Sequence, residues 1–90
     1  MTLETTTHAL LAVLAQDGGD ADAARAHLAE AERRSRSTAR RERQIVEIAG
    51  LVVAGRLARA TDLALIHTAE YPDDVALLAP VTDRRQPRAG

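Results

Sequence analysis

The sequence predicts an all-α protein built from paired helices. Three observations support this fold class: many of the apolar residues are alanine, apolar residues recur with a helical period in four stretches, and glycine or proline stands between the stretches. Alanine has the highest helix propensity of all residues, and a period near 3.6 residues indicates amphipathic helices. We therefore expect four main helices and a short fifth helical segment.

The first two helices are expected over residues 5–16 and 21–35. Gly18 and Gly19 end the first helix, because glycine tolerates the left-handed conformation at a helix C-terminus. Asp20 offers a side-chain acceptor as the N-cap of the second helix. The buried stripe of the second helix is expected to contain Ala24, Leu28 and Ala31, with Ala21 leading in.

The third and fourth helices are expected over residues 39–54 and 57–70. Ser37 or Thr38 can cap the third helix, and Gly55 closes it with a positive φ. The third helix carries two apolar stripes, which is typical of a helix packed between neighbours. These stripes are Ile45, Ile48 and Val52 on one side and Val46, Ala49 and Val53 on the other.

A fifth segment follows Pro72, which ends the fourth helix. Asp74 is expected to act as an N-cap again, before the apolar run Val75–Leu78. Pro80 is expected to stop this segment after about one turn. The predicted organisation is a helical domain over residues 1–79 and a disordered polar tail over residues 80–90.

Composition narrows the functional classes. The 90 residues suit one domain with a thin core, because Phe and Trp are absent and Tyr71 is the single aromatic residue. The absence of cysteine excludes disulfides and thiolate sites. A net charge of −1 indicates no general attraction to nucleic acid or membrane. No apolar run reaches the roughly 20 residues of a membrane helix, and the start of the chain lacks a basic signal region, so a cytoplasmic protein is expected.

The chain also contains an internal repeat. Gly19 and Gly55 lie 36 residues apart, each between two expected helices, and Ala24 and Ala60 each follow five residues later. Paired helices with a period of about 34 residues are typical of tetratricopeptide arrays. Ala31 fills the second small-residue position of the first unit, whereas His67 replaces it in the second. The closing proline is Pro72 in the second unit and is replaced by Arg36 in the first.

Several short motifs occur in a characteristic order between His8 and Leu78. They are an Ala/Leu-rich opening helix, the Gly-Gly turn, Arg41-Glu42-Arg43 at a helix start, Ala54-Gly55, and Tyr71-Pro72-Asp73-Asp74. In this order the chain resembles the tetratricopeptide repeat protein 38-like family. The resemblance implies a fragment of a longer array of helical repeats that acts as a scaffold, and none of these motifs is catalytic. No cofactor or metal site is expected.

Stacked helix pairs create a concave face that binds peptides or proteins in helical-repeat proteins. On this chain the expected partner-binding residues are Leu11, Gln44, Glu47 and Leu51. They could equally pack against repeats that are absent from this sequence. Self-association is a further possibility, because Val53, Leu63 and Ile66 lie on faces that a third unit would cover. The partner's identity does not follow from the sequence.

Other functions have weaker support. The arginine run from Arg33 to Arg43 could bind phosphates, so a small regulatory module that binds nucleic acid is the alternative function. No aromatic residue interrupts this run, and nearby glutamates can neutralise it. His8, His27 and His67 lack metal-ligand spacing on one helix, and His67 is expected to be a partly buried core residue. Serine and threonine in the connector are expected to cap a helix and not to catalyse. A non-functional truncated gene product is a third reading.

Overall fold

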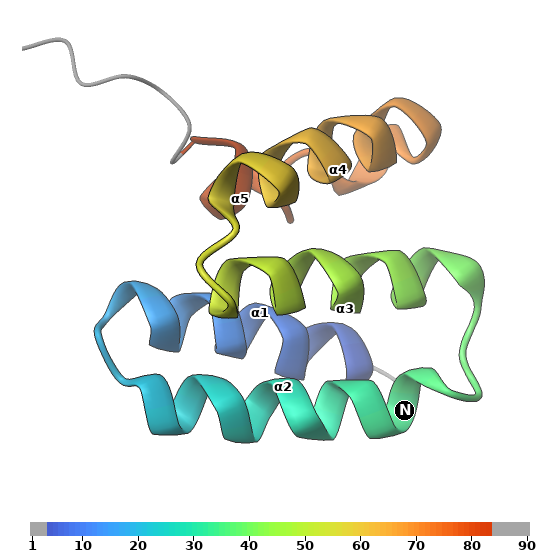
Figure 1. Ribbon diagram of the computed structural model, residues 1–90. Helices are drawn as coiled ribbons and strands as arrows, with labels where there is room; N and C mark the ends of the chain where they lie inside the picture. Colours follow the sequence, from blue (N-terminus) through green and yellow to red (C-terminus); the bar gives the residue numbers. More distant parts are fainter. Residues whose placement is uncertain (1–3, 84–90) are drawn as a thin grey trace, which may run out of the picture.

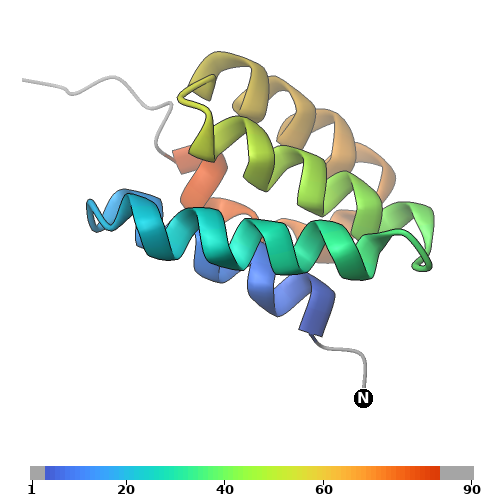
Figure 2. The same ribbon diagram turned by 60° about the horizontal axis from the view of Figure 1, so that its bottom comes forward.

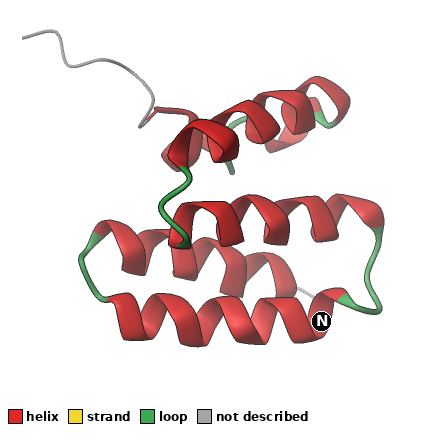
Figure 3. Ribbon diagram, viewed as in Figure 1, coloured by secondary structure: helices red, strands yellow, loops and turns green. Residues whose placement is uncertain are grey.

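Residues 4–83 are described by the computed structural model, and within this range they form helices and turns without a strand (Figures 1 and 3). The expected all-α fold class is therefore confirmed. The elements are α1 (Glu4–Asp17), α2 (Ala21–Ser35), α3 (Arg40–Val53), α4 (Leu57–Glu70), a 3₁₀ turn η1 (Pro72–Asp74) and the short α5 (Ala79–Thr82). The bounds of α2 and α4 are those predicted from the sequence.

The turns before α2 and α4 share one backbone geometry. Gly19 and Gly55 have φ values of 82° and 80°, and they are the described residues with a positive φ. Asp20 N-caps α2, because its Oδ1 atom accepts a hydrogen bond from the backbone N–H of Ala23 at 3.1 Å. The predictions for Gly55 and for the Asp20 cap are confirmed.

The long helices pack as successive antiparallel neighbours around α3. Figure 1 shows α1 and α2 as one hairpin, with α3 lying against it and α4 on the far side of α3. α3 contacts α1, α2 and α4. This position explains its two apolar stripes, whose buried members are Ile45, Val46, Ile48, Ala49 and Val52. Ala9, Ala24, Ala31, Ala60 and Ala64 are fully buried, so close approach of helices replaces the large side chains that the sequence lacks.

The predicted cap of α3 is wrong. Ala39 occupies the N-cap position in an extended conformation, without a side-chain hydrogen bond to the helix. The Thr38 hydroxyl instead donates to the Ser35 carbonyl at 3.0 Å, at the end of the preceding helix. Arg43 donates to the carbonyl of Thr38, which fixes the connector from the other side. The α2–α3 connector is therefore held by one bond to the end of α2 and one from the start of α3, and neither is a side-chain cap of the α3 N–H groups.

The chain after α4 also differs from the expectation. Asp74 ends η1 and does not cap a helix, and the following turn leads to α5, whose first turn contains Pro80. Proline is compatible with a first turn, because the N–H groups there have no partner within the helix. Residues 72–82, here called the return segment, fold back so that they contact α4 and α1 (Figure 2). Leu78 and Val81 of this segment belong to the core. The tail predicted from residue 80 onward is thus helical as far as Thr82, and residues 84–90 lie outside the described range.

Replacement of Gly55 by valine should lower the free energy of unfolding by about 1 kcal/mol or more, because a β-branched residue resists a positive φ. A Cβ atom at Gly55 would meet nothing within 4 Å, so this cost comes from the backbone alone. Gly50→Ala is the matched comparison in the interior of α3. Its new Cβ would lie 3.9 Å from Leu28 Cδ1, and the alanine should stabilise the chain by about 0.5–1 kcal/mol. Thermal and denaturant unfolding measure both changes. Equal effects of the two substitutions on the free energy of unfolding would contradict the assignment of Gly55 to a turn that requires a positive φ.

Candidate functional site

Four polar side chains meet where α3, α4 and η1 come together. Arg41 and Gln44 stand one turn apart on α3, so they share a face of that helix. His67 lies in the last turn of α4, and Asp74 follows it after Pro72 has turned the chain. We call these four residues the Asp74 cluster. It joins the return segment to the two helices that precede it.

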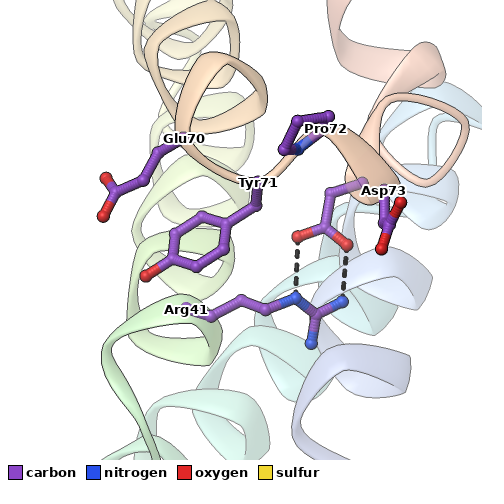
Figure 4. A pocket seen from close by; sticks show the side chains of 6 residues that line it. Arg41, Glu70, Tyr71, Pro72 and Asp73 are labelled. Atoms are coloured by element: carbon purple, nitrogen blue, oxygen red, sulfur yellow. Dashed lines mark hydrogen bonds and ion pairs between the residues drawn. The ribbon is translucent and has the colours of Figure 1, made fainter.

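The Asp74 carboxylate is the centre of the cluster. Its Oδ2 atom accepts a hydrogen bond from Arg41 Nε at 2.8 Å and its Oδ1 atom accepts one from Arg41 Nη2 at 2.5 Å (Figure 4). Such a two-pronged arginine–carboxylate pair is stronger and more directional than a single contact. Oδ2 also lies 2.7 Å from His67 Nε2. Because a carboxylate only accepts hydrogen bonds, Nε2 of the imidazole is the donor in this pair.

The second nitrogen of His67 is satisfied as well. Nδ1 lies 2.6 Å from Gln44 Oε1, and with this amide orientation a protonated ring donates to the oxygen. Rotation of the amide would place its NH₂ group there, and a neutral ring would then accept. The His67 ring therefore has hydrogen-bond partners in both of its protonation states. Among the described residues, no buried side-chain nitrogen or oxygen lacks a partner.

Burial and charge act together on Asp74. The side chains of His67 and Asp74 are 0% and 4% exposed, whereas that of Arg41 is 37% exposed. The hydrogen bond from Arg41 lowers the pKa of Asp74 below its ordinary value, and the hydrogen bond from His67 acts in the same direction against the opposing effect of burial. The same ion pair raises the pKa of Arg41. Asp74 is consequently a buried anion whose charge is balanced by its neighbours.

A surface pocket of about 320 Å³ lies beside the cluster and is lined by Arg41 and residues 70–74 (Figure 4). Glu70 at its edge forms an ion pair with Arg40. The Tyr71 ring packs against His67, with ring centroids 4.8 Å apart. His67 is enclosed and does not line the pocket. Chemically, this arrangement suits attachment of one chain segment to another through a carboxylate.

The predicted partner-binding residues separate into two groups. Leu11 and Glu47 are exposed, as a binding face requires. Gln44 is bound to His67, and Leu51 is half-buried against the core. Of the residues predicted as structural repeat positions, Ala24, Ala31 and Ala60 are fully buried between helices. Gly19 and Gly55 lie in exposed turns and have a positive φ. Pro72 begins η1.

The arginine run is largely paired. Arg33 and Arg34 both form ion pairs with Glu30 on α2. Arg40 pairs with Glu70, and Arg41 pairs with Asp74 and Glu42. These carboxylates neutralise much of the positive charge that the sequence concentrates between Arg33 and Arg43. A phosphate would have to compete with them for the same guanidinium groups.

The three histidines do not meet. His8 and His27 lie side by side on α1 and α2, with their Nδ1 atoms 3.2 Å apart, while His67 belongs to the Asp74 cluster. Within residues 4–83 there is no group of three or more His, Asp or Glu side chains that could hold a metal ion. The burial predicted for His67 is confirmed, and it is complete. Sequence reasoning missed the partner of His67, although a histidine at a small-residue position is itself a signal that a polar partner must be nearby.

Asp74→Asn should lower the free energy of unfolding at neutral pH by about 1–3 kcal/mol, because Arg41 and His67 lose a charged acceptor. The folded-state pKa of Asp74 lies below its ordinary value of 3.8, so its contribution is fully present above pH 3.8 and is lost as the pH falls through the folded-state pKa. Unfolding followed from neutral pH to strong acid should show a shallower acid decline in the variant than in the wild type. Asp62→Asn, at an exposed position on α4, should keep the wild-type decline. Parallel acid declines for Asp74→Asn and the wild type would contradict this role of Asp74.

Comparison with protein-family models, with curated proteins and with solved structures finds no match for this chain. Among residues 4–83, no helix is both long and apolar enough to cross a membrane.

Proposed function

We propose that the chain is a non-enzymatic protein–protein interaction module made of two tetratricopeptide-like helix–turn–helix units, close to the tetratricopeptide repeat protein 38-like family and part of a longer array. One observation carries the proposal. Gly19 and Gly55, 36 residues apart in sequence, adopt φ values of 82° and 80° at equivalent inter-helix turns. Ala24 and Ala60, five residues after each glycine, are both fully buried.

The order of helix packing supports the same reading. In a helical-repeat array each unit packs on its neighbour, so the first helix of one unit contacts both helices of the unit before it. Here α3 contacts α1 and α2 as well as its own partner α4. The helices thus have the neighbour relations expected of two stacked hairpins.

The outer surfaces suggest what the module binds. Several large aliphatic side chains are exposed on α1, on α4 and after η1: Leu11, Leu14, Leu57, Leu65, Ile66 and Val75. Ile66 is 62% exposed and Leu65 is 45% exposed, on a helix whose opposite face packs on α3. Exposed aliphatic groups gathered on particular elements favour contacts with other proteins. A following repeat unit, a second copy or an unrelated protein could cover them.

The nucleic-acid alternative receives less support from these contacts. Binding through the Arg33–Arg43 run requires free guanidinium groups that can release counterions from phosphates. Arg33, Arg34, Arg40 and Arg41 instead hold carboxylates of the same chain. We therefore retain the protein-interaction module as the proposed function.

Face-specific photo-cross-linking tests this function. A photo-reactive residue at Leu11 or Leu65 should form cross-links to protein in cells that produce the chain, because both positions present aliphatic surface. The same residue at Ala26, an exposed position on α2, is the matched control and should give at least several-fold less product. Mass spectrometry of the cross-linked bands identifies the partners and separates self-association from binding to other proteins. Equal labelling from all three positions would argue against a dedicated interaction face.

Self-association through the C-terminal edge is the simplest partner hypothesis, and Ile66 is the residue on which it depends most. Of the three edge residues named from the sequence, Val53 and Leu63 are half-buried, which leaves Ile66 exposed. Sedimentation equilibrium should show concentration-dependent association of the wild type. Ile66→Glu should weaken that association at least tenfold, and Ala26→Glu, which adds the same charge on α2, should leave it unchanged. A wild-type chain that stays monomeric at all concentrations would remove self-association from the proposal.

A further inference from the structure

Side-chain contacts attach the return segment to α3 and α4. Six of its backbone N–H groups donate to carbonyl oxygens of residues 71–78, within the segment and its hinge; the donors are Asp74, Val75, Leu78, Ala79, Val81 and Thr82. The hydrogen bond from α4 to its backbone, from Thr61 Oγ1 to the Val81 carbonyl, is long at 3.5 Å. The long helices also satisfy their backbone hydrogen bonds internally and pack through side chains, so the side-chain contacts of the return segment are what determine its position.

The segment has three buried side chains, and Leu77 packs beside them as a partly buried one. Asp74 accepts hydrogen bonds from Arg41 and His67. Leu78 and Val81 are 1% and 0% exposed within the core cluster. These residues follow one another at positions i, i+4 and i+7. On a continuous helix that spacing would place the three anchors on one face, as in complexes where an amphipathic helix occupies a groove. In the return segment itself residues 75–78 form a turn between η1 and α5.

Charge complementarity indicates which kind of ligand the surface beneath the return segment can bind. The chain from Pro72 to Asp83 contains three aspartates and no basic residue. Its buried aspartate meets a guanidinium supplied by α3 and an imidazole supplied by α4. If the segment left, Arg41 would keep Glu42 and His67 would keep Gln44, but both would lose the Asp74 carboxylate, and an apolar replacement could not restore it. The surface beneath the segment is therefore selective for a ligand that brings a carboxylate.

We infer that the surface of α1, α3 and α4 beneath residues 72–82 is a docking site for an acidic amphipathic peptide, in which an aspartate is followed four and seven residues later by aliphatic side chains, and that the return segment is its intramolecular occupant. This inference rests on the proposed interaction function and names the class of partner. The partner supplies the same three anchors on a more regular helix. The return segment, broken into a 3₁₀ turn, an open turn and one α-helical turn, is an imperfect version of that helix.

The intramolecular occupant determines how the site can be opened. A tethered segment has an effective concentration in the millimolar range, so a free peptide with the same anchors competes poorly with it. Weakening the tethered anchors removes this advantage without altering Arg41, Gln44 or His67. The informative protein is thus the full chain with Asp74→Ala and Leu78→Ala combined.

A fluorescein-labelled synthetic peptide with the sequence of residues 71–83 serves as the probe, and fluorescence anisotropy measures its binding. The peptide should bind the Asp74→Ala/Leu78→Ala chain at least tenfold more tightly than the wild-type chain. Binding should be lost when the peptide carries asparagine in place of its second aspartate. It should also be lost when Arg41→Gln is added to the protein, whereas Arg43→Gln, the same change two residues along α3, should have little effect.

The inference can also be tested if the variant does not fold. If the Asp74→Ala/Leu78→Ala chain loses its helical circular dichroism, millimolar wild-type peptide should restore the signal and the asparagine peptide should not. A folded variant that does not bind the peptide at millimolar concentration, an unfolded variant that the peptide does not restore, or equal binding of both peptides would overturn the docking site. Cross-linking confined to Leu11 and Leu65 alongside such a null result would leave the proposed interaction function standing on another face.

Discussion

The burial of α3 is the constraint on which the rest of the structure depends. A chain of 90 residues without Phe or Trp has little large apolar surface to bury. It concentrates that surface on α3, where Ile45, Ile48 and Val52 are at most 1% exposed, and surrounds it with alanines from α1, α2 and α4. Small residues let the helix backbones approach, so each large aliphatic group on α3 makes contact on several sides. The order of the helices follows, since each neighbour must reach this single central helix.

The Asp74 cluster adds a polar requirement to this thin core. Burying an isolated carboxylate is strongly unfavourable, and it is tolerated here because a two-pronged arginine and an imidazole satisfy both oxygens. A buried ion pair of this kind contributes less to net stability than to the choice of one arrangement over others. In this structure the carboxylate and the two buried aliphatic residues Leu78 and Val81 hold the same short segment.

The all-α fold class and the four main helices could be predicted from the sequence because their signals are local. The glycines at positions 19 and 55, the Asp20 cap and the period of the apolar residues each act within a few residues, and the structure confirms them. The Asp74 cluster depends on contacts across 33 residues between Arg41 and Asp74, which no local pattern encodes. Asp74 followed by an apolar run has the pattern of a helix start, and the long-range pairing with Arg41 overrode that local preference. The prediction that Pro80 ends the fifth segment was wrong because proline disrupts the interior of a helix but is compatible with its first turn.

The return segment can belong to the core and still be exchangeable. Its departure alone would expose Leu78 and Val81, each of which forgoes about 1.5–3 kcal/mol of burial in water. Replacement by a ligand with the same anchors conserves that burial and the charge pairing, so the remaining difference is the entropy of tethering and the helical order of each occupant. The return segment contains two prolines and lacks a continuous helix, so in helical order it is a weaker competitor than a regular helical ligand. Stability and binding are therefore linked through one set of contacts, and a change at Arg41 must weaken the fold and the docking of an acidic peptide together.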